Sequence, residues 1–206
     1  MPLFKTIQYN SHTKILVWEI TETKKDLLQK IPLTKTSIAR LETMKSVLHQ
    51  KGFLSVRHLL LVAGYTDAEL FYTKDGKPHL KDGKRISITH SFTFSAIAIS
   101  NNPIGIDIEK NREKILRISS KFIGNEYDFM RQENEVDFLT VVWGAKESLY
   151  KIHPEGGLLF KHHLPIEPFK LSDNKTRGWI KKDNIYEVYD ISFERIKDFT
   201  LVYATN

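Results

Sequence analysis

The sequence predicts an α+β protein built from two halves, each with helices packed on an antiparallel sheet. Segments with helical 3-4 spacing of apolar residues are followed by short segments in which apolar and polar residues alternate. The alternating segments follow one another with turn residues between them, as in antiparallel meanders. The length of 206 residues allows one large domain or two small ones, each with its own core. Together these observations indicate an α+β arrangement.

The composition limits the classes of protein that need to be considered. Hydrophobic residues make up 41% and charged residues 27%, as in ordinary globular proteins. The absence of cysteine excludes a disulfide framework, a thiolate zinc site and a cysteine nucleophile. The N-terminal residues lack the apolar run of a signal peptide, and no apolar run is long enough to cross a bilayer. We therefore expect a cytoplasmic protein that does not bind membranes.

The positive charge lies in the first half of the chain. The net charge is +6, which suggests an anionic partner such as nucleic acid, a membrane surface, a phosphorylated small molecule or an acidic protein. Residues 1–103 contain 15 lysine and arginine residues against 8 acidic residues, and residues 104–206 contain 16 against 17. The first half thus carries +7 and the second −1.

In the first half, residues 14–20 predict a strand with Trp18 embedded in it. Residues 33–58 show helical spacing, with Ser37 as the expected N-cap and Gly52 as an interruption. A second helical segment is expected from residue 53 to about Gly64. A turn-rich segment and two paired strands complete this half, at residues 73–84, 85–91 and 94–100.

The second half is expected to start at about Pro103. Residues 105–109 predict a strand, and residues 117–132 one or two helices with a break at Gly124. The longest predicted helix spans residues 136–152, with one buried face formed by Val142, Ala145, Leu149 and Ile152. Four further segments alternate like antiparallel strands, at residues 156–164, 176–182, 184–193 and 199–205.

The helix at residues 136–152 places three chemically distinct side chains on one stripe. Trp143, Glu147 and Lys151 are four residues apart in the segment WGAKESLYK and therefore share a helix face. Taken alone, a Glu→Lys pair at this spacing is an ordinary surface pair that contributes about 0.2–0.5 kcal/mol. The stripe indicates a functional site only if other charged groups lie beside it.

The strand GIDIE supplies such groups. Asp107 and Glu109 face the same side of a strand, while Ile106 and Ile108 face the core. Two neighbouring carboxylates repel each other unless a cation lies between them, and magnesium prefers carboxylates together with substrate phosphates. A solvated edge strand is the alternative explanation. His90, at the end of ITHS, and Lys77, in the turn DGKPHL, could each contact an anion, although both residue types are also common in structural or solvated positions.

Several other site types are excluded. The sequence has no phosphate-binding G-x-x-x-x-G-K-[ST] loop, no G-x-G-x-x-G, no H-E-x-x-H and no G-x-S-x-G. The adjacent His162 and His163 do not suit joint ligation of a metal from a regular element.

The order of these segments resembles the 4′-phosphopantetheinyl transferases. The matching elements run from K-P through I-T-H-S, G-I-D-I-E and F-I-G-N-E to W-G-A-K-E-S-L-Y-K. The match is to the larger, surfactin-synthetase type, in which one chain holds two pseudo-symmetric α+β halves, and it covers about Arg40 to Phe169. This resemblance implies a monomer that transfers the phosphopantetheine arm of coenzyme A to a serine of a carrier protein, with Mg²⁺ as cofactor.

The resemblance also implies roles for individual residues. Asp107, Glu109 and Glu147 match the metal-binding carboxylates, and Lys151 matches the lysine that stabilises charge at the reacting phosphate. The coenzyme A contacts would come from His90, Thr89, Lys77 and, by a looser alignment, Arg57. Thr89 replaces a serine that is frequent in the family and keeps its hydroxyl group. Glu126 matches an acidic residue whose role, catalytic or structural, is open.

Two alternatives and several details remain open from the sequence. A nucleic-acid-binding protein would explain the positive charge but not the three carboxylates. A catalytically silent relative that binds coenzyme A would be favoured by loss of a metal carboxylate, and none is lost. Glu147 is the expected general base and Asp107 the weaker candidate. The carrier type, acyl or peptidyl, and tolerance for acylated coenzyme A are not determined.

Overall fold

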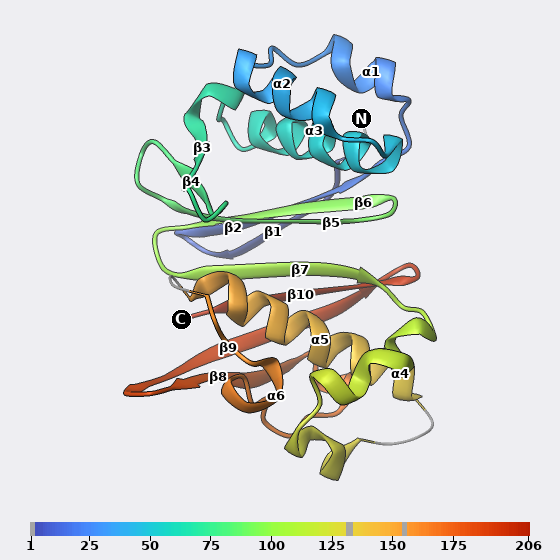
Figure 1. Cartoon of the computed structure of the whole chain (residues 1–206), viewed down its shortest axis with the longest axis vertical. Coiled ribbons are helices and arrows are strands. Elements are labelled where there is room, and N and C mark those ends of the chain that lie inside the picture. Colours follow the sequence, from blue (N-terminus) through green and yellow to red (C-terminus); the bar gives the residue numbers. More distant parts are fainter. Residues whose placement is uncertain (1–2, 131–133, 154–155) are drawn as a thin grey trace. The chain divides into compact units, whose positions relative to one another are not determined.

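The computed structural model describes residues 3–130, 134–153 and 156–206. The chain divides into two compact units, Met1–Asn102 (unit 1) and Pro103–Asn206 (unit 2). This division lies beside the expected boundary near Pro103, while the roles expected of the two halves remain predictions. Both units combine helices with an antiparallel sheet, which confirms the predicted α+β class (Figure 1).

Unit 1 is a four-stranded antiparallel sheet with its helices packed over one face (Figure 1). The strand order is β1-β2-β6-β5, and β3 and β4 form a separate hairpin. The elements are β1 (Leu3–Asn10), β2 (Thr13–Glu19), α1 (Lys24–Gln29), α2 (Lys35–Thr43), α3 (Val47–Val62), η1 (Asp67–Glu69), β3 (Leu70–Tyr72), β4 (Pro78–Leu80), β5 (Arg85–Ser91) and β6 (Phe94–Ser100).

The predicted strands of unit 1 are confirmed, and the strands β1, β3 and β4 were not anticipated. The pairing of β5 with β6 joins Ile88 to Ile97 and His90 to Ser95. The longest missed strand is β1, which pairs with β2 at the sheet edge and shows alternating burial along its whole length. Within residues 73–84, the expected turns flank the short strand β4.

Two helix boundaries in unit 1 were predicted wrongly. The N-cap of α2 is Thr34, whose hydroxyl oxygen accepts a hydrogen bond from the backbone N–H of Ser37 at 3.2 Å. Ser37 itself lies inside the helix, buried. Gly52 does not interrupt a helix, because α3 continues through it from Val47 to Val62. A Cβ atom at Gly52 would lie 3.0 Å from the His90 ring, so close packing explains the glycine there.

Unit 2 holds the sheet β7-β10-β9-β8, with the long helix α5 packed on one face (Figure 1). All of its strand pairs are antiparallel. The elements are β7 (Ile104–Lys110), α4 (Lys114–Ile118), η2 (Ser119–Lys121), η3 (Asn125–Phe129), α5 (Glu135–Ile152), α6 (Phe160–His163), η5 (Leu171–Asp173), β8 (Lys175–Lys182), β9 (Ile185–Ile196) and β10 (Phe199–Thr205).

Most predictions for unit 2 hold. The helix predicted at residues 136–152 is α5, and Val142, Ala145 and Leu149 of its expected buried face are 0% exposed. The helical segment predicted at 117–132 is a series of short turns, and its residues 131–132 lie outside the described part. The strand predicted at 156–164 is wrong: Gly156 and Gly157 have φ of 65° and 67°, and the short helix α6 follows. Consecutive left-handed residues cannot continue an extended strand.

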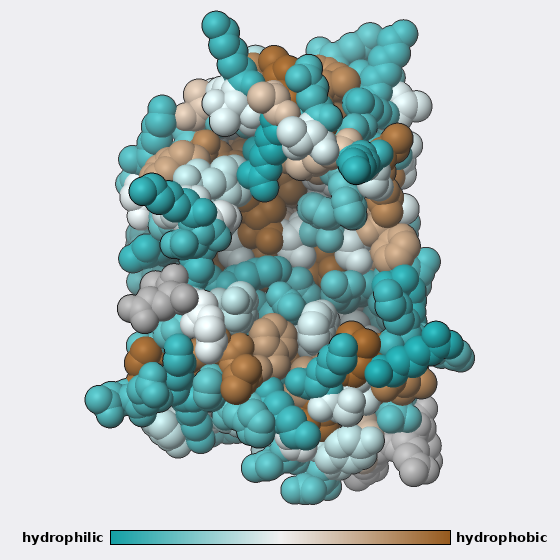
Figure 2. All heavy atoms as spheres, in the orientation of Figure 1, coloured by the Kyte–Doolittle hydropathy of each residue, from teal (hydrophilic) through white to brown (hydrophobic). Residues whose placement is uncertain are grey.

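Each unit has its own hydrophobic core. The core of unit 1 lies between α3 and the sheet and includes Leu16, Leu54 and Ile97, while that of unit 2 lies under α5. The face shown in Figure 2 is mainly hydrophilic, with hydrophobic side chains scattered between charged ones. None of the helices formed by the described residues has the length and apolar character needed to cross a membrane.

Candidate active site

The strand β7 carries the two carboxylates that the sequence singles out. Ile106 and Ile108 are 0% exposed, as expected for buried positions, but they lie on the strand face opposite Asp107 and are not part of the core under α5. Asp107 is 5% exposed and Glu109 is half-buried. In its sheet, β7 is an edge strand that pairs with β10. Asp107 is therefore more buried than a side chain on a solvated edge strand, the alternative explanation, would be. A helix covers it.

That helix is α5, and two glycines let it approach the sheet closely. A Cβ atom at Gly105 would lie 1.9 Å from the backbone oxygen of Ser148, so β7 and α5 are in contact along their backbones. A Cβ atom at Gly144 would lie 2.7 Å from Cγ2 of Val202 on β10. Helix residues near 144, 147, 148 and 151 thus share the face that meets β7. The two glycines position the helix stripe beside the strand carboxylates.

Lys151 joins the helix stripe directly to the strand. Its Nζ donates to the backbone oxygen of Ile106 at 2.8 Å and to Oδ1 of Asp107 at 2.9 Å. The Lys151 side chain is 27% exposed and that of Asp107 is 6% exposed. The ammonium group therefore reaches both the carboxylate and the surface.

Glu147 lies one helical turn before Lys151 and is strongly affected by its surroundings. Burial, together with the charges of Asp107 and Glu109, raises the pKa of Glu147 to about 7, although Lys151 opposes this effect. Three carboxylates thus interact electrically within one small region. The sequence predicted this gathering, and the structure brings all four residues together in unit 2.

The fit of these residues to a divalent cation depends on the chemistry of the donor set. Residues 3–130, 134–153 and 156–206 contain no group of three or more histidine, aspartate or glutamate side chains already arranged to hold a metal ion. Asp107, Glu109 and Glu147 nevertheless supply the hard oxygen donors that magnesium prefers, and their mutual repulsion is what a cation would relieve. The residues fit the cofactor, and Mg²⁺ itself stays a prediction.

A surface hollow of about 150 Å³ adjoins this group on the side of Glu109. Its lining combines cations with apolar side chains. These are Lys110, Arg112, Lys114, Ile115, Ile118, Thr140 and Trp143. Trp143 packs edge-on against Phe122 and at an angle against Phe160, both in unit 2. These ring contacts of Trp143 lie within unit 2.

One residue of the same helix was missed by the sequence analysis. Lys146 is 0% exposed, and its Nζ lies 2.8 Å from Oε1 of Glu126, itself 1% exposed. Burial lowers the pKa of Lys146, and the Glu126 charge opposes that change. The available signal was its position on the apolar face, between Val142 and Leu149. Glu126 therefore has a structural partner, which favours the structural role left open for it.

Comparison with known proteins points to one family. A family model described as the 4′-phosphopantetheinyl transferase superfamily matches residues 103–203, which include β7 and α5. The 4′-phosphopantetheinyl transferase gsp of Aneurinibacillus migulanus is 31% identical over 140 residues, covering 65% of this chain and 57% of that protein. The 4′-phosphopantetheinyl transferase Sfp of Bacillus subtilis (strain 168) is 30% identical over 102 residues, covering 47% of this chain and 43% of that protein.

Residues 103–203 of this chain thus match the 4′-phosphopantetheinyl transferase superfamily. The resemblance seen in the sequence motifs is thereby confirmed. The chain spans about half the length of the curated relatives it matches. The carboxylate and lysine group of unit 2 lies entirely inside the region that matches the superfamily model.

Unit 1 carries the residues that the transferase resemblance assigns to coenzyme A. His90 is exposed at the end of β5, and its ring lies against Gly52 of α3. The preceding Thr89 is 7% exposed, so its hydroxyl group lies largely inside the unit. The ring of His49, also on α3, has its centroid 6.0 Å from that of His90. His90 is therefore the accessible member of the ITHS segment.

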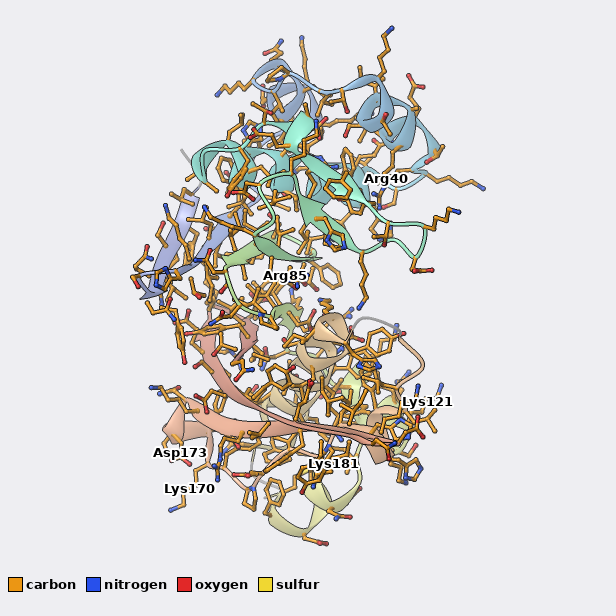
Figure 3. All side chains as sticks on the ribbon, turned by 90° about the vertical axis from the view of Figure 1, so that its left-hand side faces the viewer. Arg40, Arg85, Lys121, Lys170, Asp173 and Lys181 are labelled. Carbon is orange, nitrogen blue, oxygen red and sulfur yellow. The ribbon has the colours of Figure 1, made fainter. Side chains whose placement is uncertain are left out.

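Lys77 lies between β3 and β4, where burial lowers its pKa although Asp75 opposes this. Its backbone N–H donates to Oγ1 of Thr73 at 3.2 Å, which fixes the turn. The guanidinium of Arg40 lies 4.4 Å from the ring centre of Tyr72, on the strand before this turn (Figure 3). Arg40 adds a cation beside the hairpin of Lys77. This placement of Arg40 could not be predicted from the sequence, because α2 and β3 meet only in the fold.

Arg57 is committed to contacts inside unit 1. It is 3% exposed, its Nε donates to Oδ1 of Asp67 at 3.1 Å, and its guanidinium lies 3.5 Å from the ring centre of Phe53. A phosphate could reach Arg57 only if this buried pair opened. The expected contact of Arg57 with coenzyme A stays a prediction, while the contacts described here are structural ones within unit 1.

Proposed function

We propose that this protein transfers the 4′-phosphopantetheine arm of coenzyme A to a serine of an apo carrier protein, acyl or peptidyl, and releases 3′,5′-ADP. The match to the transferase superfamily supports this activity. The observation that carries it is the packing of α5 on β7, which gathers Asp107, Glu109, Glu147 and Lys151. A carboxylate group with a lysine at its edge suits a magnesium-assisted phosphoryl transfer.

Asp107, Glu109 and Glu147 are the residues that would hold the magnesium ion. When bound, the ion would neutralise charge on the pyrophosphate oxygens and stabilise the leaving group. The strand supplies two of the ligands and the helix the third. Loss of either element's position would therefore weaken the set as a whole.

Glu147 is the proposed general base. The serine Oγ attacks the β-phosphorus of coenzyme A, and Glu147 accepts the serine proton directly or through a water molecule. The new bond joins Oγ to the β-phosphorus as the bond from that phosphorus to the bridging oxygen breaks, and 3′,5′-ADP leaves with the negative charge. A base works best with a pKa near the working pH, and burial together with the charges of Asp107 and Glu109 raises the pKa of Glu147 to about 7 in the metal-free protein. Asp107 is the weaker candidate because Lys151 already binds it.

Lys151 is proposed to hold Asp107 and to stabilise charge at the reacting phosphate. Its three N–H donors exceed the two contacts described above, so one donor remains for a phosphate oxygen. A pre-positioned cation of this kind lowers the barrier without having to reorganise during the reaction.

Unit 1 would supply the contacts to the nucleotide end of coenzyme A. Lys77, His90 and the Thr89 hydroxyl are the proposed binding residues, with Arg57 as the least accessible candidate. The excess of positive charge in residues 1–103 suits a substrate with a 3′-phosphate and a pyrophosphate. The monomeric state and the cytoplasmic location remain part of this proposal.

The alternative of a nucleic-acid-binding protein keeps only the net charge in its favour. Three interacting carboxylates would repel a phosphate backbone, and none of the comparisons points to nucleic acid. A catalytically silent relative would bind coenzyme A as the enzyme does. It would differ only in that it does not modify a carrier protein.

The test is the intact mass of an apo acyl or peptidyl carrier protein after incubation with this protein, coenzyme A and Mg²⁺. We expect a gain of one phosphopantetheine, which is lost with a chelator and in Asp107→Ala and Glu147→Ala. Glu135→Ala, on the first turn of the same helix, is the matched control and should retain activity. Coenzyme A binding without transfer to any carrier would favour the silent relative, and absence of both would reject the proposal.

A further inference from the structure

The W-x-x-K half of the segment WGAKESLYK makes contacts that the proposed chemistry does not use. The Nζ of Lys146 donates to the backbone oxygen of Phe122 at 2.7 Å and to that of Phe160 at 3.1 Å. Its third partner is Oε1 of Glu126 at 2.8 Å. All three N–H donors of a fully buried ammonium group are thus satisfied by protein groups.

Glu126 extends these contacts to two further segments. Its Oε2 accepts from the backbone N–H of Gly124 at 2.7 Å, and its Oε1 accepts from that of Ile166 at 3.0 Å. Lys146 and Glu126 therefore join α5 to the segment around residues 122–126 and to the segment around residues 160–166. These segments have little regular structure of their own, so the ion pair determines where they meet the helix.

Trp143 contacts the same two residues whose carbonyls Lys146 binds. Its ring centroid lies 5.1 Å from that of Phe122 and 5.3 Å from that of Phe160. Trp143 and Lys146 are three residues apart and so lie on one side of the helix. One residue holds the side chains of Phe122 and Phe160, and the other holds their backbones. We call these contacts the Trp143–Lys146 anchor.

The anchor is directly coupled to the proposed base. Glu147 follows Lys146 in the chain, and successive residues of a helix point about 100° apart. With Lys146 fixed on one side and Gly144 packed on the sheet on another, the rotation of this turn has little freedom. The side chain of Glu147 then has a defined direction toward Asp107 and Glu109.

We propose that the Trp143–Lys146 anchor, with Glu126 as its counter-ion, is the positioning device that holds Glu147 against the β7 carboxylates. This inference rests on the proposed function. It divides the segment into two tasks: Trp143 and Lys146 set the rotation of α5, and Glu147 and Lys151 act on metal and phosphate. Lys146 and Glu126 are positioning residues and do not touch the substrate.

The experiment must separate positioning from stability. Lys146→Met leaves the Glu126 charge buried without its counter-ion and should destabilise the fold strongly. The double variant Lys146→Met/Glu126→Gln removes both charges and should regain most of that stability, since replacing a whole buried pair is often neutral. The control is Arg177→Met, which removes the exposed ion pair between Arg177 and Glu167.

We expect the folded double variant to show a kcat at least about 10-fold lower and a higher Mg²⁺ requirement, because small displacements of catalytic groups are costly. The KM for coenzyme A should change less than about twofold, since the proposed nucleotide contacts lie in unit 1. Amide hydrogen exchange at residues 143–151 should be at least about 10-fold faster than in the wild type. Arg177→Met should match the wild type in every measurement.

The proposal would be overturned if the double variant had the same rate, Mg²⁺ dependence and hydrogen exchange as the wild type. Lys146 and Glu126 would then have a structural role only. If the wild type itself modifies no carrier, the proposed function fails, while hydrogen exchange still decides whether the anchor orders this turn. Should the double variant not fold, Trp143→Phe reduces the contacts with Phe122 and Phe160 but keeps the ion pair. The same readouts, in the same direction, are then expected, and unchanged values would reject the anchor.

Discussion

Each unit contains a buried ion pair that holds its main helix, but the two pairs are built in opposite ways. In unit 1 the centre is an acid: Asp67 accepts from Arg57, Ser37 and the backbone and hydroxyl of Thr34. In unit 2 the centre is a cation, Lys146. The Arg57–Asp67 pair joins α3 to the start of α2. Neither of its two residues is next in sequence to Lys77, Thr89 or His90, the other proposed binding residues of unit 1. The unit 2 pair lies next to Glu147.

This difference shows that a charged residue in a family motif can act through structure, through chemistry, or through both. Arg57 resembles a ligand-binding arginine in the sequence, yet its guanidinium binds Asp67 and packs on the ring of Phe53. Lys146 was not singled out at all, yet it adjoins the proposed base. Burial, which the sequence does not reveal, decides between these roles.

The largest effect should come from breaking the unit 1 pair. Arg57→Ala leaves Asp67 buried without its cation, and we expect a loss of about 3–5 kcal/mol of unfolding free energy. In the double variant Arg57→Met/Asp67→Asn most of that stability should return. Denaturant unfolding measures the stability, and coenzyme A titration follows binding. Affinity equal to wild type in the stable double variant would establish a structural role, whereas a large loss would restore Arg57 as a ligand.

A smaller effect is expected where unit 2 relies on backbone contact. Gly105→Ala places a Cβ atom 1.9 Å from the backbone oxygen of Ser148, and neither backbone can move freely. We expect a destabilisation of about 3 kcal/mol, at the upper end for overpacking, together with loss of carrier modification. Thermal unfolding of the variant with and without Mg²⁺ tests this. A melting temperature within a degree of the wild type would contradict the close packing of α5 on β7.

The equivalent change in unit 1 should be nearly neutral for stability. Gly52→Ala meets the ring of His90 at 3.0 Å, and an exposed side chain can shift. The gain in helix propensity, about 1 kcal/mol, would offset the crowding. We expect a stability change below about 1 kcal/mol, but a raised KM for coenzyme A if His90 binds it. An unchanged KM with His90 displaced would count against His90 as a ligand.

The smallest effect is a pH dependence confined to unit 1. Burial lowers the pKa of His58, although its contact with the Leu27 carbonyl and the charge of Glu22 oppose this. The unfolded chain then binds the proton more tightly, so the stabilisation is present above about pH 6.5 and is lost as the pH falls below that value. Between pH 7.5 and 5.5, the melting temperature of His58→Gln should fall less than that of the wild type. Equal losses would show that His58 does not titrate in this range.

The sequence alone determined much of the candidate site, because its spacing is local. Residues four apart on one helix and two apart on one strand must share a face, so Glu147 with Lys151 and Asp107 with Glu109 followed from counting. The α+β class followed from periodicity in the same way.

The errors arose where a local preference did not decide the structure. Thr34 and Ser37 are both suitable N-caps, and only the partner Asp67, thirty residues further on, settles which one lies inside the helix. Gly52 has the poorest helix propensity in α3, but the helix continues through it, with the ring of His90 packed closely against it. In both cases the local preference alone gave the wrong prediction.

Only the tertiary structure decided what each charge touches. Lys146 looks like any helical lysine in the sequence, and its burial depends on Phe122, Glu126 and Phe160, which arrive from two other segments. The pKa of Glu147 likewise depends on Asp107 and Glu109 from a strand forty residues away. Periodicity fixes which side chains share a face of their own element. Burial and electrostatic interaction depend on which other element covers that face, and that is determined only when the chain folds.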